Sequence, residues 1–188
     1  VQVRQGGLAE AIYEYSPSGQ LTTTIDANLA VSKSWYDAYG FRTRSDDANS
    51  GTTTWEYNAF GDVTVERRWG YVGPPGTVLP TTAPVQTRSF IYDVLDRRTA
   101  EYDGAERCGT GGALQSTWTY DTAANGVGRL AGMATADGRT NYSVAYNDKG
   151  QIVSMTQTVD RTSYLVDIEY DGQGREWKVT YPAVAGER

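Results

Sequence analysis

The sequence contains no histidine and only one cysteine, Cys108. Without histidine, a Ser-His-Asp triad, a histidine general base and a histidine-containing zinc site are all excluded. One cysteine cannot form an internal disulfide, and a lone thiol without a histidine partner is weak support for a nucleophile. Cys108 stands in a glycine-rich stretch that is typical of a surface loop. We therefore expect no enzyme activity, no catalytic residue, no cofactor and no metal site.

Positive charge is also scarce. The chain has 17 Lys and Arg against 23 Asp and Glu, a formal net charge of -6. Nucleic-acid binding needs a net basic face, so no nucleic-acid partner is expected. The sequence has no signal-peptide pattern and no apolar run long enough to span a bilayer. Because it lacks an initiator methionine and starts within a strand pattern at Val1, we expect a fragment of a longer protein.

Residues that favour strands are abundant. The 188 residues include 14 Tyr and 21 Gly, together with many Thr, Val and Trp, and such a chain can hold one or two domains with a sizeable core. The run Val166 to Tyr170 alternates apolar and polar residues, which predicts a half-buried strand. A helical period is absent apart from a possible short turn near Leu8 to Tyr13. The composition and the patterning together predict an all-β protein.

A tyrosine-centred unit recurs along the chain at spacings of 21, 21, 35, 28, 26 and 24 residues. The tyrosines, called anchor tyrosines below, are Tyr15, Tyr36, Tyr57, Tyr92, Tyr120, Tyr146 and Tyr170. The residues that directly follow them, at position +1, are Ser16, Asp37, Asn58, Asp93, Asp121, Asn147 and Asp171. Position +4 holds Gly19, Gly40, Gly61, Asp96, Gly150 and Gly174, and the unit of Tyr120, four residues longer, reaches Gly128 followed by Arg129. Periods of 20 to 50 residues are typical of repeat architectures.

Each unit reads as a strand, a tight turn and a returning strand. Asp, Asn and Ser hydrogen-bond turn backbone, and glycine adopts the positive φ that closes a short hairpin with a bulge. We expect positive φ at Gly61, Gly150 and Gly174, and a loss upwards of about 1 kcal/mol on changing Gly150 to valine. Two residues before the anchor tyrosine, six of seven units carry a large apolar or aromatic residue, which a strand places on the same face. Consecutive hairpins of this kind predict an antiparallel meander.

Other segments are predicted to be turns or loops. Second turns are expected at residues 45–51, at Asp137-Gly138 and at residues 158–161. Residues 69–87 contain four prolines and residues 103–116 are rich in glycine, so both predict long surface loops. Trp69 and Tyr71 are expected to fix the first loop on the sheet, with a ligand contact as the alternative. The acidic pairs, Asp46-Asp47 and Asp93/Asp96, are assigned to turn chemistry and not to catalysis.

The unit resembles a known repeat. The pattern Tyr-Asp-x-x-Gly-Arg is complete from Tyr170 to Arg175, partial in residues 36–40 and 146–152, and present with an insertion in residues 120–130. It resembles the YD repeat of Rhs proteins, of the encapsulating component of insecticidal Tc toxins, and of teneurins, over residues 13–181. The resemblance implies a long β-sheet strip wound as a spiral into a hollow shell. In the bacterial members such a shell encloses a C-terminal toxin, and in the animal members it forms an extracellular adhesion scaffold. The self-cleaving segment of the family is not recognisable in this chain.

These observations define an expected function. Residues 1–188 are interpreted as a single YD-repeat module with a curved sheet. It would be a shell or scaffold segment of a large secreted or cell-surface protein, encapsulating or presenting a C-terminal effector. The expected partners are flanking repeats of the same polypeptide and an encapsulated toxin domain. The alternative is an extracellular carbohydrate-binding or adhesion module, because exposed Trp and Tyr suit sugar rings. The first and last strands, near residues 1–3 and 176–181, are expected to be open edges that self-associate.

Overall fold

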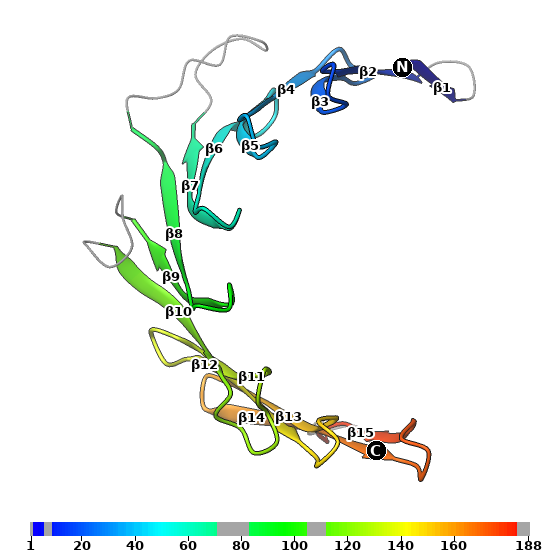
Figure 1. The fold of residues 1–188 in the computed structure, drawn as a ribbon, viewed down its shortest axis with the longest axis vertical. Helices are drawn as coiled ribbons and strands as arrows, with labels where there is room; N and C mark the ends of the chain where they lie inside the picture. The colour runs from blue at the N-terminus through cyan, green and yellow to red at the C-terminus, as the bar shows by residue number, and fades with distance from the viewer. Residues whose placement is uncertain (1, 6–8, 71–82, 105–111, 184–188) are drawn as a thin grey trace. The chain divides into compact units, whose positions relative to one another are not determined.

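The computed structural model describes residues 2–5, 9–70, 83–104 and 112–183 (Figure 1). These residues form fifteen strands, and no helix occurs among them. The strands are β1 (Gln2–Gln5), β2 (Ala9–Tyr15), β3 (Leu21–Ile25), β4 (Val31–Tyr36), β5 (Arg42–Asp47), β6 (Gly51–Tyr57), β7 (Val63–Trp69), β8 (Gln86–Tyr92), β9 (Arg98–Asp103), β10 (Ala113–Tyr120), β11 (Leu130–Thr135), β12 (Thr140–Tyr146), β13 (Ile152–Val159), β14 (Thr162–Tyr170) and β15 (Glu176–Thr180). Within the described residues no helix is long and apolar enough to cross a membrane.

The strands form one sheet in which spatial order equals sequence order from β1 to β15. The pairings are antiparallel wherever their register is defined. The sheet is not closed, since β1 and β15 each have a single neighbour. The predicted all-β antiparallel meander is confirmed.

Contacts divide the chain into two compact units. The first unit comprises residues 1–91 and 102–113, and the second comprises residues 92–101 and 114–188. The first therefore holds β1 to β7 and nearly all of β8, whereas the second holds β11 to β15 and nearly all of β10. Strand β9 contributes residues to both.

The helical turn expected near Leu8 to Tyr13 is wrong for its described part. Residues 9–15 are strand β2, which pairs with β1 on one side and β3 on the other. Ile12 lies opposite Ile25, and Tyr13 lies opposite Thr24. Pairing on both sides outweighs the weak local helical pattern, because it satisfies the backbone groups of the whole segment.

Strands also extend into segments that were predicted to be loops or turns. β7 continues to Trp69, which pairs with Thr52, and β8 starts at Gln86. β10 already begins at Ala113. Asp46 and Asp47 are the last residues of β5, but Oδ1 of Asp47 accepts from the amides of Asn49 and Ser50 in the turn that follows, as its assignment to turn chemistry predicted. The added residues of β7, β8 and β5 pair with a neighbouring strand: Trp69 with Thr52, Gln86 with Arg68, and Asp46 and Asp47 with Thr52 and Gly51. The interior of both predicted loops, including Tyr71 and Cys108, lies outside the described residues.

Few side chains are deeply buried in either unit. The buried apolar residues of the described chain are Val65, Phe90, Ala100 and Val144, and the buried polar ones are Thr52 and Ser89. Because residues 2–5, 9–70, 83–104 and 112–183 form a sheet without any helix, its faces have little to be buried against. Contacts between successive hairpins therefore matter more here than they do in a two-layered fold.

Candidate functional site

The turns after five of the anchor tyrosines share a hydrogen-bond pattern, which is well illustrated by the unit of Tyr36. The amide of Asp37 donates to the carbonyl of Phe41 at 2.9 Å, and the amide of Gly40 donates to the carbonyl of Asp37 at 3.1 Å. Oδ1 of Asp37 accepts from the amides of Tyr39 and Phe41, both at 2.9 Å. This is a type I turn closed by a glycine bulge. The same side-chain pattern occurs at Asn58, Asp93, Asn147 and Asp171.

The residue at the bulge is left-handed in every unit. The φ angles are +83° for Gly19, +93° for Gly40, +97° for Gly61, +59° for Asp96, +78° for Gly128, +73° for Gly150 and +79° for Gly174. The expected positive φ at Gly61, Gly150 and Gly174 is confirmed. Asp96 substitutes for glycine because aspartate tolerates the left-handed region better than most residues.

A hydrogen bond from five of the seven anchor tyrosines joins one hairpin to the preceding one. The hydroxyl donates to the backbone carbonyl of the residue that opens the returning strand of the previous unit. The observed pairs are Tyr36 to Leu21, Tyr57 to Arg42, Tyr120 to Arg98, Tyr146 to Leu130 and Tyr170 to Ile152, at 2.7 to 3.0 Å. We call this contact the inter-repeat tyrosine bond. It explains why the position holds tyrosine where phenylalanine would supply the same ring.

The side chain at position +5 makes a second contact with the following unit. Phe41 stacks on Tyr57, with ring centroids 5.0 Å apart and an interplanar angle of 23°. A Cβ added at Gly61 would lie only 2.7 Å from Cζ of Phe41. In the last pair of units, Nε2 of Gln151 donates to the carbonyl of Gly174 at 2.8 Å. Glycine at +4 therefore supplies positive φ and, at Gly61, also leaves room for the preceding repeat.

Arginine at position +5 links two units electrostatically. Nε of Arg97 donates to Oδ2 of Asp93 at 2.8 Å, and Nη2 donates to Oδ2 of Asp121 at 2.7 Å. Its Cζ lies 4.4 Å from the ring centroid of Tyr120, which is a cation–π geometry. Hydrogen bonds from Arg97 are the main reason that the pKa values of Asp93 and Asp121 are lowered. In the last unit, the backbone amide of Arg175, followed by its side chain, lowers the pKa of Asp171.

Two further features of the repeat were not predicted from the sequence. In the first three units, a threonine follows the residue that opens the returning strand. Its hydroxyl donates to the backbone carbonyl of the residue before the anchor tyrosine. The pairs are Thr22 to Glu14, Thr43 to Trp35 and Thr64 to Glu56, at 3.2 to 3.5 Å. The second feature is the acceptor of the tyrosine bond. The threonine at position +7 could have been recognised from the sequence. The backbone carbonyl that accepts the tyrosine bond could not, because every residue type has one.

The described residues contain no cluster of three or more His, Cys, Asp or Glu side chains suited to a metal ion. Trp69, expected to fix a loop, lies in β7, and its Nε1 donates to Oγ1 of Thr54 at 3.5 Å. The motif residues are thus brought together by the tyrosine bond, the +5 contact and the turn hydrogen bonds. What this arrangement does is lock successive hairpins to one another.

Changing Tyr146 to phenylalanine is expected to lower the free energy of unfolding by about 1 kcal/mol, because the hydroxyl bond to Leu130 is lost while the ring is kept. Urea denaturation would measure the change. The matched control is Tyr39→Phe, since Tyr39 is 88% exposed, and this variant should unfold at the wild-type urea concentration. Equal effects of the two changes would argue against a stabilising tyrosine bond.

The Ser32–Asp47 contact between β4 and β5 gives a pH-dependent expectation. Oγ of Ser32 donates to Oδ2 of Asp47 at 2.6 Å, and this bond is the largest reason that the pKa of Asp47 falls from 3.8 to about 2. A lowered pKa in the folded state means stability that is present above pH 4 and lost as the pH falls towards 2. Ser32→Ala should therefore cost about 1 kcal/mol at pH 7.

That difference between wild type and Ser32→Ala should shrink as denaturation is repeated from pH 4 down to pH 2. Ser163→Ala is the control, because the Ser163 hydroxyl bonds to Thr158 and, among the described residues, to no carboxylate. A difference for Ser32→Ala that stays constant with pH would contradict the assignment.

No family model matches the chain, and no curated protein matches it in sequence. Solved structures with similar folds include a crystal structure of TcdB2-TccC3, at 16% identity and a TM-score of 0.43, covering 92% of this chain and 10% of that chain. TcdB2-TccC3 without its hypervariable C-terminal region matches at 14% identity and a TM-score of 0.46, covering 92% and 10%. The Photorhabdus luminescens Tc holotoxin pore matches at 13% identity and a TM-score of 0.40, covering 96% and 12%. This chain spans about a tenth of the length of those chains.

Proposed function

We propose that this chain is a YD-repeat scaffold segment of a large secreted or cell-surface protein of the Rhs or Tc-toxin type. In this role it contributes consecutive hairpins to a shell that encapsulates or presents a C-terminal effector. Its partners are flanking repeats of the same polypeptide and the enclosed effector domain. The segment itself carries out no catalysis.

The observation that carries this proposal is the inter-repeat tyrosine bond. It recurs five times in the described structure with the same donor and the same type of acceptor. A bond that joins one hairpin to its predecessor suits a protein whose task is to keep a sheet strip in register. The +5 contacts support the same role, because each joins two successive units.

The open sheet supports the same role. Strand β15 has one neighbour, and all five of its residues are exposed. Exposed strand edges are templates for pairing with a further strand. In a continuous array of repeats, the adjoining repeat would cover this edge.

Protease protection in the full-length parent protein tests the proposal. The region that follows Arg188 should contain further Tyr-Asx-x-x-Gly units and then a domain of unrelated sequence. That domain should resist added protease in the native protein and be digested once the repeats are unfolded by denaturant. A domain that is digested equally fast under both conditions would overturn encapsulation.

The absence of catalysis has its own test. A panel of protease, nuclease and glycosidase assays should show no turnover by this chain, and a glycan array should show no specific binding. Activity abolished by a single Asp or Glu substitution would overturn the scaffold assignment. Specific glycan binding would favour the carbohydrate-binding alternative.

A further inference from the structure

Asp37 is an exception among the acidic and amide residues at position +1. In the other such units, one side-chain atom at +1 accepts from the turn amides. The second atom, Nδ2 of Asn or Oδ2 of Asp, is hydrogen-bonded to another side chain. The bonds are Asn58 to Asp62, Asp93 to Arg97, Asp121 to Arg97, Asn147 to Gln151 and Asp171 to Arg175, at 2.7 to 3.0 Å. At Asp37, position +5 is the apolar Phe41. Oδ1 of Asp37 accepts two backbone bonds, but Oδ2 has no hydrogen bond or ion pair among the described residues.

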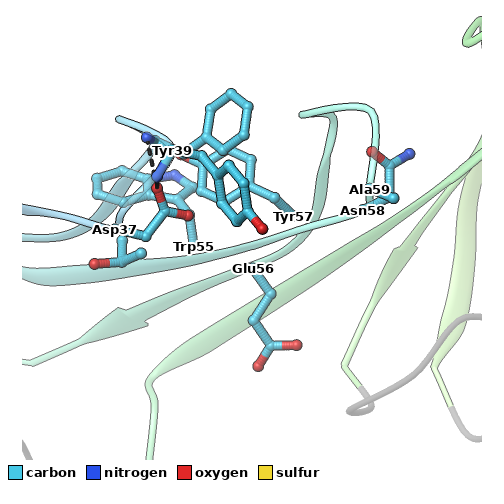
Figure 2. Close-up of a pocket in the computed structure, with 9 residues that line it drawn as sticks. Asp37, Tyr39, Trp55, Glu56, Tyr57, Asn58 and Ala59 are labelled. Atoms are coloured by element: carbon cyan, nitrogen blue, oxygen red, sulfur yellow. Dashed lines mark hydrogen bonds between the residues drawn. The ribbon is translucent and has the colours of Figure 1, made fainter.

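This carboxylate borders an aromatic hollow of about 810 Å³ within the first unit. Four aromatic residues line it, namely Tyr39, Phe41, Trp55 and Tyr57. Figure 2 shows Asp37 on the same side of strand β6 as the rings of Tyr39, Trp55 and Tyr57, with Glu56 extending from the other side. Tyr39 is 88% exposed, so its ring is open to a ligand.

The same molecule shows which chemical group suits such a site. Arg97 places its guanidinium against a +1 carboxylate while its Cζ lies 4.4 Å from the centroid of the Tyr120 ring. Arg129 lies 5.5 Å from the centroid of the Tyr146 ring. A planar guanidinium combines several hydrogen-bond donors with favourable stacking on an aromatic face, which a compact ammonium does less well.

The neighbours of Asp37 leave one place for such a group. Phe41 already covers Tyr57, and Arg42 lies 4.4 Å from the centroid of the Trp55 ring. The ring of Tyr39 is the exposed aromatic surface that remains beside the unbound carboxylate oxygen. The acidic chain, with its net charge of -6, further favours a cationic ligand.

We propose that the Asp37–Tyr39 hollow binds the guanidinium of an arginine side chain presented by another protein segment. Oδ2 of Asp37 accepts its N–H groups, and the ring of Tyr39 stacks on its plane. Charge-assisted hydrogen bonds of this kind are stronger than neutral ones. This inference does not depend on the scaffold role proposed above.

Titration with a short blocked peptide, acetyl-Gly-Arg-Gly-amide, tests the proposal, with ¹⁵N NMR shifts of the Asp37 and Tyr39 amides as the readout. Asp37→Asn should bind at least about tenfold more weakly, because the charge-assisted bond is lost. The turn itself should survive, since Asn58 and Asn147 occupy the same position in other units. The matched control is Asp148→Asn, which removes an exposed turn carboxylate from the second unit.

A second variant, Phe41→Arg, gives this repeat the internal arginine that Arg97 supplies elsewhere, and it should abolish peptide binding. A peptide in which citrulline replaces arginine should bind at least about tenfold more weakly than the arginine peptide. Equal binding of both peptides, or undiminished binding by Asp37→Asn or Phe41→Arg, would overturn the proposal. Tighter binding of free arginine than of the peptide would overturn the assignment to a protein side chain.

Discussion

Replacing Phe90 with alanine is expected to lower the free energy of unfolding by about 3 kcal/mol. Phe90 lies in β8 and is 4% exposed, which makes it the largest of the buried apolar side chains of the described chain. Its neighbour Ser89 is 1% exposed, so the segment is packed closely. Truncation of a buried aromatic side chain removes its transfer free energy and leaves a cavity that the surroundings fill only in part.

Urea denaturation with an unchanged m-value would measure this loss as a shift of the midpoint. The matched control is Phe60→Ala, since Phe60 occupies a turn and is 79% exposed. Its effect should stay within about 0.5 kcal/mol. A loss below about 1 kcal/mol for Phe90→Ala would show that the sheet draws little of its stability from this side chain.

Replacing Gly61 with valine is expected to cost about 3 kcal/mol, from two sources. The φ angle of +97° strains a β-branched residue. The new Cβ would also lie 2.7 Å from Cζ and 2.9 Å from Cε1 of Phe41, so the ring would have to leave its stacked position on Tyr57. Strain and displaced packing should therefore add.

Gly19→Val separates the two sources, because Gly19 has φ +83° but no heavy atom within 4 Å of an added Cβ. It should cost about 1–2 kcal/mol, the strain alone. In a Phe41→Ala background, the excess cost at Gly61 should disappear. If Gly19→Val and Gly61→Val destabilise the chain equally, the contact with Phe41 contributes nothing.

The local parts of the fold were predictable from the sequence. Tyrosine, then Asp or Asn, then glycine three residues later specifies a strand end, a capped turn and a left-handed bulge from short-range chemistry alone, as Tyr170 to Gly174 illustrates. Aspartate was expected to replace glycine at position 96 for the same reason, and the φ of Asp96 is +59°.

The contacts that join units were not predictable in the same way. The acceptor for Tyr146 is the carbonyl of Leu130, and every residue type carries that group. Asp160 and Arg161 also show the limit of local signals. Both have positive φ, at 46° and 71°, in a two-residue turn between β13 and β14. Arginine does not favour this region, so the long pairing of the two strands imposes it.

The choice of a main-chain oxygen as acceptor has an evolutionary consequence. The residues that supply it include Leu21, Arg42 and Ile152, which share no side-chain chemistry. A duplicated or shuffled unit therefore needs no compensating substitution in its new neighbour to form the tyrosine bond. Lineages can lengthen, shorten or reorder such an array by recombination, while the side chains that face outward diverge freely.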